Sequence, residues 1–280
     1  MPATQPAKPS KTDIIARHLL AAACAGADVL ATLTADETLW RERKADGSFV
    51  TAADLAADKA IKACLLERLP HVPVVSEESP DAAQARHEFI LVDPLDGTAE
   101  FMRGGHEFAV AVAYIIDGRA VAGAITAPRL GRAWWAGTRA QAGIYTPGGG
   151  LPEGGKALQT RQGKANEMVA LVSRLHGDDW SARAVSKIGP AGCRAVSSAL
   201  KFGLIASGEA QFHIRCGPTM EWDVAAGDAI IKASGGLVTD LKGAPLVYGQ
   251  ASKGFRNPPF VAAAGSRILE AALDAVQRES

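Results

Sequence analysis

The sequence predicts a mixed α/β fold, and three of its features lead to that prediction. Hydrophobic residues make up 48% of the 280-residue chain, which is enough for a substantial buried core. The first half contains successive short apolar segments separated by turns, a pattern typical of an antiparallel meander. Beyond a segment rich in Gly and Pro, residues 146–156, predicted strands and helices alternate.

Two helices and six strands are predicted in the first half. The Ala- and Leu-rich segment 12–34 fits an amphipathic helix. A second helix runs from the candidate N-cap Thr51 to residue 69, just before Pro70. The polar segment between them, residues 35–48, is predicted to be a mobile loop. The predicted strands are residues 72–75, 89–92, 108–116, 120–127, 132–136 and 141–145.

Four strands and four helices are predicted in the second half. The strands are residues 168–173, 210–214, 237–239 and 260–264, and the helices are 179–187, 197–207, 221–233 and 266–276. The Gly/Pro-rich segment is the predicted boundary between an N-terminal subdomain, residues 12–147, and a C-terminal one, residues 148–280. Residues 1–11 are predicted to form a disordered tail.

Charge and composition exclude several classes of protein. Basic and acidic residues balance at 30 each, which argues against a general binder of nucleic acid polymers. The cysteines form no C-x-x-C pair and the histidines no H-E-x-x-H motif, so we expect reduced thiols in a cytoplasmic protein and no zinc hydrolase chemistry. No apolar run is judged long enough to cross a membrane, so no transmembrane segment is expected.

The segment 91–98 places two carboxylates where an apolar strand is predicted to end. Pro94 stiffens the turn between Asp93 and Asp96, so their side chains can converge. Gly97 permits close approach of a ligand to the backbone, and Thr98 offers an N–H and a hydroxyl. Such oxygen ligands suit Mg²⁺, but a tight Asp-rich turn that caps a helix explains these eight residues equally well.

Two further acidic positions favour the metal site. Glu77 and Glu78 follow a predicted strand, and Asp223 lies at the start of a predicted helix. Carboxylates gathered at the ends of buried segments repel one another and are costly unless cations neutralise them. Three such positions therefore favour a cation site over helix capping and surface solvation.

These segments resemble the two signatures of the inositol monophosphatase superfamily, whose members are Mg²⁺-dependent, lithium-sensitive phosphatases of sugars and nucleotides. The signatures match Asp93-Pro94-Leu95-Asp96-Gly97-Thr98 and Trp222-Asp223-Val224-Ala225-Ala226-Gly227. Further matches are residues 50–54, 75–78 and 197–202, so the resemblance extends over almost the whole chain beyond the tail. It implies an α/β/α/β/α layered sandwich of the type shared with fructose-1,6-bisphosphatases.

Within the superfamily, the chain is most similar to 3′(2′),5′-bisphosphate nucleotidases of the CysQ type. The details that carry this likeness are Glu100-Phe101, Lys201-Phe202 and the segment 217–221 that leads into Trp222. The resemblance implies hydrolysis of 3′-phosphoadenosine 5′-phosphate, a by-product of sulfate assimilation, to AMP and phosphate. Ala99 departs from the pattern, because these nucleotidases commonly have Lys there, and a cation that faces phosphate is therefore absent.

The resemblance implies two Mg²⁺ ions and leaves open whether a third ion binds. The loop 36–46 is predicted either to help bind that third ion or to act as a lid. The ligands implied for the first ion are Glu77, Asp93 and the Leu95 carbonyl. Those implied for the second ion are Asp93, Asp96 and Asp223. Asp54 and Thr98 are implied to position or deprotonate the attacking water, with Glu77 as a further catalytic carboxylate.

Substrate contacts are implied as well. The backbone N–H groups of Gly97 and Thr98, at the start of a short helix, would bind the scissile phosphate. The substrate-binding residues implied are Leu95, Asp96, Gly97, Thr98, Lys201 and Asp223. Two interpretations of Lys201 stay open, because it could face the nucleotide phosphate or extend to solvent. Arg215 is likewise open between a phosphate contact and the surface.

Other substrates, a non-catalytic role and other locations remain alternatives at this point. Inositol monophosphate or fructose 1,6-bisphosphate could be the substrate, or the protein could bind metal as a regulator without turnover. The complete set of implied metal ligands argues against the regulator. The predicted partner is a phosphorylated small molecule, and the predicted location is the cytoplasm. A homodimer and peripheral attachment to the inner membrane are left open.

Overall fold

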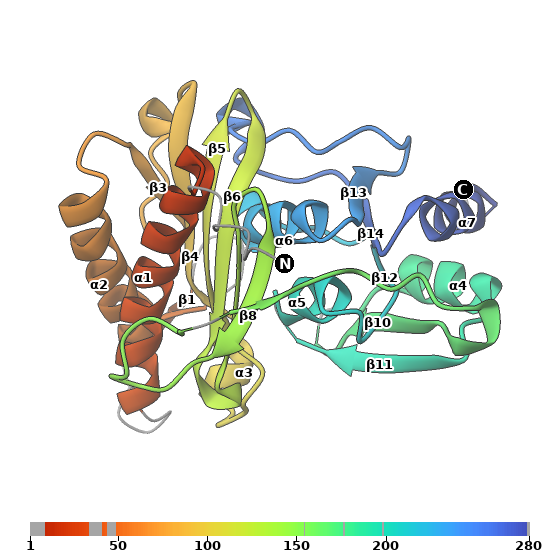
Figure 1. Ribbon diagram of the computed structural model, residues 1–280. Coiled ribbons are helices and arrows are strands. Elements are labelled where there is room, and N and C mark those ends of the chain that lie inside the picture. Colours follow the sequence, from red (N-terminus) through yellow and green to blue (C-terminus); the bar gives the residue numbers. More distant parts are fainter. Residues whose placement is uncertain are drawn as a thin grey trace, which may run out of the picture.

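The structure, a computed structural model, describes residues 9–33, 41–43, 49–153, 155–175, 177–197 and 199–278. The predicted tail falls mostly outside these residues, and so does the predicted loop 35–48 apart from residues 41–43. The described elements stack in five layers that alternate helices with sheets, as Figure 1 shows. The predicted α/β/α/β/α sandwich is therefore confirmed.

The first layer consists of two helices, α1 (Lys11–Thr32) and α2 (Ala52–Arg68). Each begins with a capping box, in which a carboxylate in the first turn accepts a hydrogen bond from the N-cap backbone. The pairs are Asp13 with Ser10 in α1, and Asp54 with Thr51 in α2. Both helices pack on one face of the larger sheet, where their apolar side chains share a core with it. Both match the predicted helices to within two residues at each end.

Helix α1 corrects one expectation. It is 22 residues long and its most apolar window has a mean hydropathy of 1.6, so by length and composition it could cross a membrane. Of that window, 56% is buried inside the fold, against α2 and the larger sheet. An apolar helix of this kind is also what the core of a layered α/β fold requires, so its hydropathy is weak evidence for a membrane span.

The larger sheet has seven strands in the order β3-β4-β5-β6-β7-β8-β9. Only β3 and β4 pair in parallel, and the other neighbours are antiparallel, which confirms the predicted meander. The strands are β3 (Val74–Ser76), β4 (Glu88–Asp96), β5 (Ala109–Ile116), β6 (Arg119–Ala127), β7 (Arg132–Ala136), β8 (Ala140–Ile144) and β9 (Lys156–Ala157). The sequence did not predict β9, the hairpin of β1 (Arg41–Arg43) and β2 (Phe49–Thr51), or the extension of β4 to Asp96.

Side chains alternate across the larger sheet and so build two cores. On β5, Val110, Val112 and Tyr114 pack with α1 and α2. Their neighbours Ala111 and Ala113 face the third layer, where their small side chains let a helix approach closely. That helix is α6 (Glu221–Ala233), whose first two turns contain the second signature, residues 222–227.

Close contact between α6 and the sheet depends on Gly123 of β6. A Cβ atom at this position would lie 2.6 Å from the backbone oxygen of Ala226 on α6. No real Cβ tolerates that distance, so a glycine is required where helix and strand meet. The contact fixes how far the N-terminal half of α6 stands from the sheet.

The second sheet has five strands in the order β11-β10-β12-β14-β13. Strands β11, β10 and β12 are parallel, and β14 is antiparallel to β12 and β13. The strands are β10 (Val169–Ser173), β11 (Gly192–Val196), β12 (Phe212–Arg215), β13 (Leu237–Asp240) and β14 (Phe260–Ala263). The sequence predicted all of them except β11, whose residues are mostly exposed.

Helices cover both faces of the second sheet. Helices α5 (Leu200–Ala206) and α6 lie between the two sheets, and α4 (Asp179–Ile188) and α7 (Ser266–Gln277) cover the far face (Figure 1). The predicted helix 197–207 begins three residues later than expected, at Leu200. The remaining short helices are α3 (Thr98–Met102) and the 3₁₀ turns Ala82–Gln84, Pro128–Leu130, Ala165–Glu167 and Ala251–Lys253.

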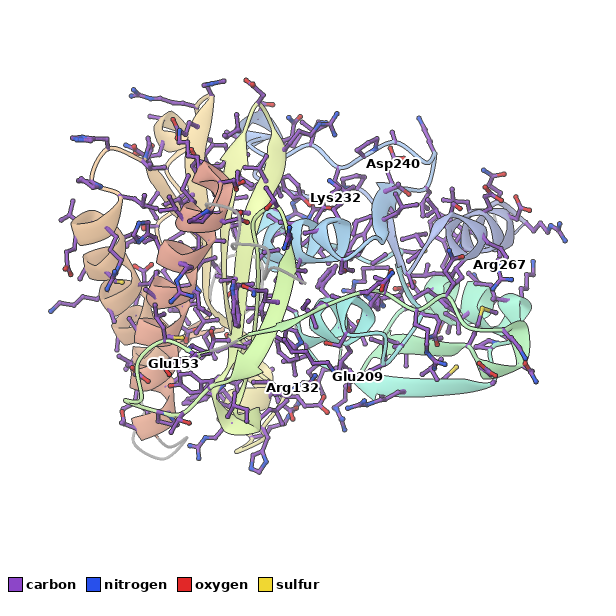
Figure 2. The ribbon with its side chains drawn as sticks, in the orientation of Figure 1. Arg132, Glu153, Glu209, Lys232, Asp240 and Arg267 are labelled. Atoms are coloured by element: carbon purple, nitrogen blue, oxygen red, sulfur yellow. The ribbon has the colours of Figure 1, made fainter. Side chains whose placement is uncertain are left out.

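Polar contacts join the first sheet to the layers beyond it. Arg132 of β7 forms an ion pair with Glu209 in the turn after α5, and both are labelled in Figure 2. The indole of Trp134 donates a hydrogen bond to the hydroxyl of Ser207 at 3.0 Å. Strand β9 lies beyond the predicted subdomain boundary at 147/148 and still pairs with β8 of the first sheet. The division into two subdomains stays a prediction.

Candidate active site

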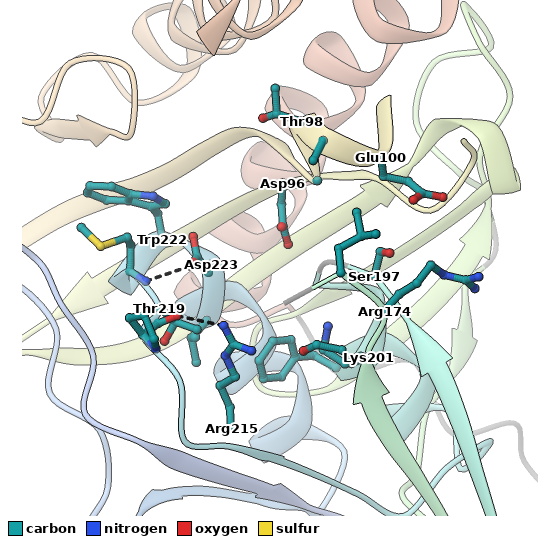
Figure 3. Close-up of a pocket in the computed structure, with 18 of the residues that line it drawn as sticks. Asp96, Thr98, Glu100, Arg174, Ser197, Lys201, Arg215, Thr219, Trp222 and Asp223 are labelled. Carbon is teal, nitrogen blue, oxygen red and sulfur yellow. Dashed lines mark hydrogen bonds between the residues drawn. The ribbon is translucent and has the colours of Figure 1, made fainter. Parts of the chain in front are cut away.

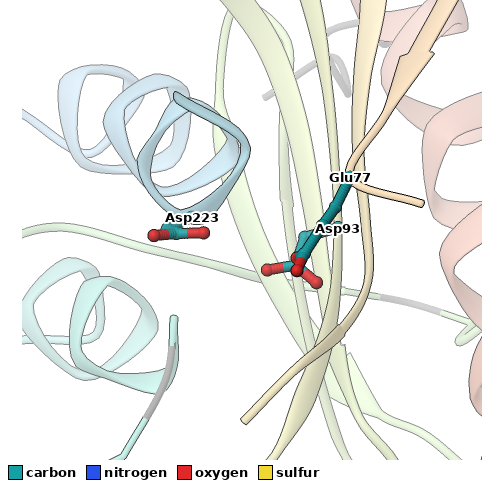
Figure 4. A group of neighbouring side chains, drawn as sticks. All are labelled: Glu77, Asp93 and Asp223. Carbon is teal, nitrogen blue, oxygen red and sulfur yellow. The ribbon is translucent and has the colours of Figure 1, made fainter. Parts of the chain in front are cut away.

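Three carboxylates from different elements meet at one end of the larger sheet. Glu77 follows β3, Asp93 lies in β4, and Asp223 lies in the first turn of α6. One carboxylate oxygen of each lies within 4.8 Å of the others, and Figure 4 shows Asp223 facing the other two across the gap between sheet and helix. The parallel pairing of β3 with β4 places Glu77 beside Asp93, because the Glu77 backbone N–H donates to the Val92 carbonyl at 3.0 Å.

A β-bulge in β4 aims two carboxylates at the same face of the sheet. Residues three apart on a regular strand point to opposite faces. In β4, however, Asp93 pairs with Ala111 and Asp96 pairs with Ala109, so three steps on β4 match two on β5. Because Ala109 and Ala111 share the face that packs with α6, Asp93 and Asp96 share it as well. The predicted turn after residue 92 is wrong, and the bulge brings these side chains together instead.

Burial and mutual repulsion raise the pKa values of the clustered carboxylates. Burial raises the pKa of Asp93 well above its ordinary value, and the neighbouring carboxylates, first that of Glu77, raise it further. Burial also raises the pKa of Asp223, followed by the charge of Asp96, whereas a hydrogen bond from the Met220 backbone lowers it. A bound cation offsets this repulsion, so an all-oxygen, negatively charged pocket suits a hard divalent ion.

Asp96 lies beside the three-carboxylate group and connects it to α5. One of its oxygens accepts a hydrogen bond from the backbone N–H of Ala199, the N-cap of α5. The same side chain lines the cleft described below. Asp96 therefore links the end of β4 to the start of α5 across the cleft.

Asp54 and Thr98, far apart in sequence, form a hydrogen-bonded pair. The Thr98 hydroxyl lies 3.0 Å from one oxygen of Asp54 and 3.1 Å from the Leu95 carbonyl. The other oxygen of Asp54 accepts hydrogen bonds from the backbone and hydroxyl of Thr51, at 2.8 and 2.6 Å. Asp54 is 2% exposed, so this network fixes its orientation.

Gly97 adopts the left-handed backbone conformation that lets helix α3 begin at Thr98. Its φ of 102° lies in the left-handed region, which residues with a Cβ adopt only with strain. The short helix α3 begins directly after it, as the resemblance implies. Thr98 thus stands at the head of α3 with its hydroxyl directed back toward α2.

A cleft of about 570 Å³ opens between the carboxylates and α5 (Figure 3). Glu77, Asp96 and Asp223 line one side of it, and Lys201 of α5 and Arg215 of β12 line the other. Both cationic side chains are buried, at 7% and 8% exposure. The cleft therefore joins a negative site, suited to a cation, to a positive region suited to an anion.

Lys201 is buried and does not extend to bulk solvent, so that interpretation is wrong, and its contact with a substrate phosphate stays a prediction. Its ammonium group donates a hydrogen bond to the Val196 carbonyl at 3.3 Å. Burial lowers the pKa of Lys201 to about 8, although the nearby charge of Asp96 acts in the opposite direction. Arg215 also lines the cleft, and its guanidinium donates to the Pro218 carbonyl at 3.1 Å.

Sequence reasoning missed two groups that hold the site in place. The ammonium group of Lys62 donates a hydrogen bond to Asp58, its neighbour on α2, at 2.6 Å. Asp58 also accepts one from the Ser76 hydroxyl, and Lys62 donates one to the Ser79 hydroxyl, each at 2.6 Å. The two serines lie on either side of Glu77 in the sequence. The spacing of four residues between Asp58 and Lys62 on a helix is a signal that could have identified them. Arg174, at the end of β10, lines the cleft and pairs with Glu107 at 2.8 Å, and no sequence pattern marks it.

The fold and site together define a class of protein: a five-layer α/β enzyme whose cleft is lined by partly buried carboxylates. The chain matches the Inositol monophosphatase family over residues 11–278, and it belongs to that family. The predicted superfamily resemblance is therefore confirmed.

Within this family, the chain is similar to several relatives of the same name. The 3′(2′),5′-bisphosphate nucleotidase CysQ of Salmonella typhimurium is 38% identical over 229 residues, which cover 78% of this chain and 86% of the relative. The enzyme of the same name from Escherichia coli K12 is 37% identical over 228 residues, with the same coverage.

Solved structures agree on the fold. CysQ from Bacteroides thetaiotaomicron, a bacterial member of the inositol monophosphatase family, matches with a TM-score of 0.74 and 29% identity, over 89% of this chain and 96% of that one. An inositol monophosphatase from Zymomonas mobilis has a TM-score of 0.75 at 24% identity, over 96% of this chain and all of its own, and supports the fold alone.

Proposed function

We propose that the protein is a Mg²⁺-dependent 3′(2′),5′-bisphosphate nucleotidase that hydrolyses 3′-phosphoadenosine 5′-phosphate to AMP and phosphate. The observation that carries this proposal is the cleft that Glu77, Asp96 and Asp223 line at one side and the buried Lys201 and Arg215 line at the other. A substrate with two phosphates matches it, one phosphate at the cation site and one at the buried cations. The names of the relatives support the same substrate class.

The residues present fit Mg²⁺, because every donor is a carboxylate or carbonyl oxygen. Glu77, Asp93 and the Leu95 carbonyl would hold one ion. Asp93, Asp96 and Asp223 would hold a second. When bound, Mg²⁺ supplies positive charge that offsets the charge of the phosphoryl group during transfer. The loop proposed for a third ion lies outside the described residues apart from residues 41–43.

The chain's own groups orient the attacking water. The Thr98 hydroxyl donates its proton to Asp54, so the hydroxyl oxygen keeps lone pairs that accept a hydrogen bond from water. A water held there is aligned for in-line attack, and Asp54 takes up the proton through the Thr98 hydroxyl. Glu77 is a further carboxylate at the reacting centre. The backbone N–H groups of Gly97 and Thr98 would bind the scissile phosphate.

On the other side of the cleft, the buried cations bind the second phosphate. Lys201 and Arg215 are less hydrated there than at a surface, so their attraction for an anion is stronger. They also compensate in part for the missing cation at Ala99. A cytoplasmic location, where such a nucleotide would arise, is part of this proposal.

One experiment tests the proposal directly. Phosphate release is measured from the bisphosphate nucleotide, inositol monophosphate and fructose 1,6-bisphosphate, each with Mg²⁺, with a chelator, and with Mg²⁺ plus Li⁺. We expect the highest kcat/KM for the nucleotide, loss of release with the chelator, and inhibition by Li⁺. Preference for either other substrate would contradict the nucleotidase assignment, and Mg²⁺ binding without any release would favour a regulator.

A further inference from the structure

A buried histidine at the cleft has no role in the mechanism above. His213 lies on β12, is 2% exposed and lines the cleft together with Lys201 and Arg215. Because side chains alternate along a strand, His213 and Arg215 share one face of β12. The His213 ring contacts Phe260 edge-on at 5.8 Å between centroids, and Phe260 in turn stacks on Phe202 of α5. This face therefore looks into the space between the two sheets.

The surroundings of His213 fix its tautomer. Its Nδ1 atom lies 2.9 Å from the Leu171 carbonyl, which can only accept a hydrogen bond, so Nδ1 carries the proton. Burial lowers the pKa of His213 well below its ordinary value, and the charge of Lys201 lowers it further. The ring is thus neutral near pH 7, and Nε2 presents a bare lone pair.

The lone pair on Nε2 has no hydrogen-bond partner among the described residues. A neutral Nε2 accepts hydrogen bonds and cannot donate one to a phosphate oxygen. The group that suits it is a neutral donor, namely a hydroxyl or an amino group. Such donors lie on the nucleoside part of a nucleotide, whereas the adjacent Lys201 and Arg215 suit its phosphate.

We propose that Nε2 of His213 accepts a hydrogen bond from a hydroxyl or amino group of the substrate's nucleoside, which makes His213 a specificity-determining residue. This inference rests on the proposed nucleotidase function. A substrate that lacks the donor leaves a buried acceptor unpaired, and enzyme sites reject such analogues more strongly than they reject changes in apolar contacts.

Two variants separate this role from a structural one. In His213→Asn the amide reaches the position of Nδ1, so it can keep the hydrogen bond to the Leu171 carbonyl while the cleft loses its acceptor. In His213→Gln the amide oxygen reaches the position of Nε2 and restores an acceptor in the cleft. The substrates are adenosine 3′,5′-bisphosphate, its 2′-deoxy analogue, its inosine analogue and adenosine 3′-monophosphate, and kcat/KM is measured for each.

We expect H213N to lower kcat/KM for the parent nucleotide about tenfold, the effect of one neutral hydrogen bond. For the analogue that lacks the donor bound by Nε2, kcat/KM of H213N should equal that of the wild type. The 2′-deoxy analogue would identify the donor as the 2′-hydroxyl, and the inosine analogue would identify it as the adenine amino group. H213Q should keep most of the wild-type preference for the parent nucleotide.

Other results would overturn the inference. An equal loss with all four substrates would assign His213 a purely structural role, and a loss that disappears only with adenosine 3′-monophosphate would place the imidazole on the second phosphate. If the wild type hydrolyses none of the nucleotides, the proposed function fails, and this inference fails with it.

Discussion

Three helices of this protein carry an aspartate at the same position of the first turn, and the three aspartates do different things. Asp13 in α1, Asp54 in α2 and Asp223 in α6 each accept a hydrogen bond from the N-cap backbone. Asp54 accepts further bonds from Thr51 and Thr98, so hydrogen bonds occupy both of its oxygens. Asp223 instead faces Glu77 and Asp93. The comparison shows that the same capping geometry can hold a carboxylate for hydrogen bonding or for a cation.

The largest expected effect comes from Asp223, where the difference between cation binding and hydrogen bonding is tested most directly. Replacing it with Asn keeps an oxygen for the Met220 N–H but removes a charge that a cation needs. We expect kcat to fall on the order of 1000-fold, because several kcal/mol of charge stabilisation are lost. We also expect the Mg²⁺-induced increase in Tm to shrink, while Tm in chelator is unchanged or higher because repulsion is relieved.

Asp54→Asn is the matched control for that variant. It should also lose activity, but its Mg²⁺-induced increase in Tm should equal that of the wild type. Equal loss of this increase in both variants would show that Asp54 holds the cation too, and the distinction between the two aspartates would fail.

Thr98 tests the hydrogen-bonded side of the comparison. Thr98→Val keeps the shape of the side chain and removes the hydroxyl between water and Asp54, so we expect kcat to fall about 100-fold with little change in KM. Thr98→Ser keeps the hydroxyl and should retain most of the activity. If the valine variant turns over at the wild-type rate in steady-state assays, the role given to Thr98 is wrong.

Gly123 tests the placement of Asp223 without touching the site. A methyl group at this position must displace the backbone of α6, so Gly123→Ala should lower the free energy of unfolding by about 1–3 kcal/mol. It should also weaken Mg²⁺ binding, measured by calorimetry, because the first turn of α6 moves. Gly192→Ala on β11 is the control, since a Cβ there meets no atom within 4 Å; equal effects of the two substitutions would refute the close-contact argument.

Asp13 carries the smallest expected effect, because it caps a helix away from the site. Partial burial opposes ionisation, but hydrogen bonds from Ser10 and Thr138 outweigh it and lower the pKa of Asp13 to about 2. A carboxylate with a lowered pKa stabilises the fold above its ordinary pKa near 4 and loses that contribution as the pH falls through 2. Since the group is largely exposed, Asp13→Asn should cost about 1 kcal/mol at pH 7.

The pH series supplies the check on Asp13. In urea unfolding, the difference between wild type and variant should disappear by about pH 2, the folded-state pKa of Asp13. A difference that stays constant from pH 7 to pH 2 would mean that the charge of Asp13 does not contribute.

The sequence predicts the meander and the strand-end carboxylates because both follow from local patterns. Apolar runs bounded by turn residues mark β5 and β6, acidic residues after an apolar run mark Glu77, and a position at the start of a predicted helix marks Asp223. The residues of β11 are exposed and mixed in polarity, so no period of two reveals that strand. The positions of Lys201 and His213 depend on how the second sheet packs against α5, and no local pattern encodes that packing.

The bulge in β4 is the clearest case of information that the local pattern lacks. A spacing of three residues on a strand predicts opposite faces, so Asp93 and Asp96 converge only because the pairing with β5 shifts. The sequence offered Pro94 as the cause of convergence through a turn. The observed cause is a change of register within a continuing strand.

Because of that shift, the relative placement of the two carboxylates is set by the register of β4 against β5. Most single substitutions leave this register unchanged. Removing one residue from the segment 93–96 would restore regular pairing and leave the two carboxylates two residues apart, still on the face toward α6. What the extra residue supplies is backbone that the strand pairing does not use: Leu95 has no partner in the register with β5, and its carbonyl accepts a hydrogen bond from the Thr98 hydroxyl instead. One inserted residue can in this way release a strand carbonyl for a site while both carboxylates keep their face.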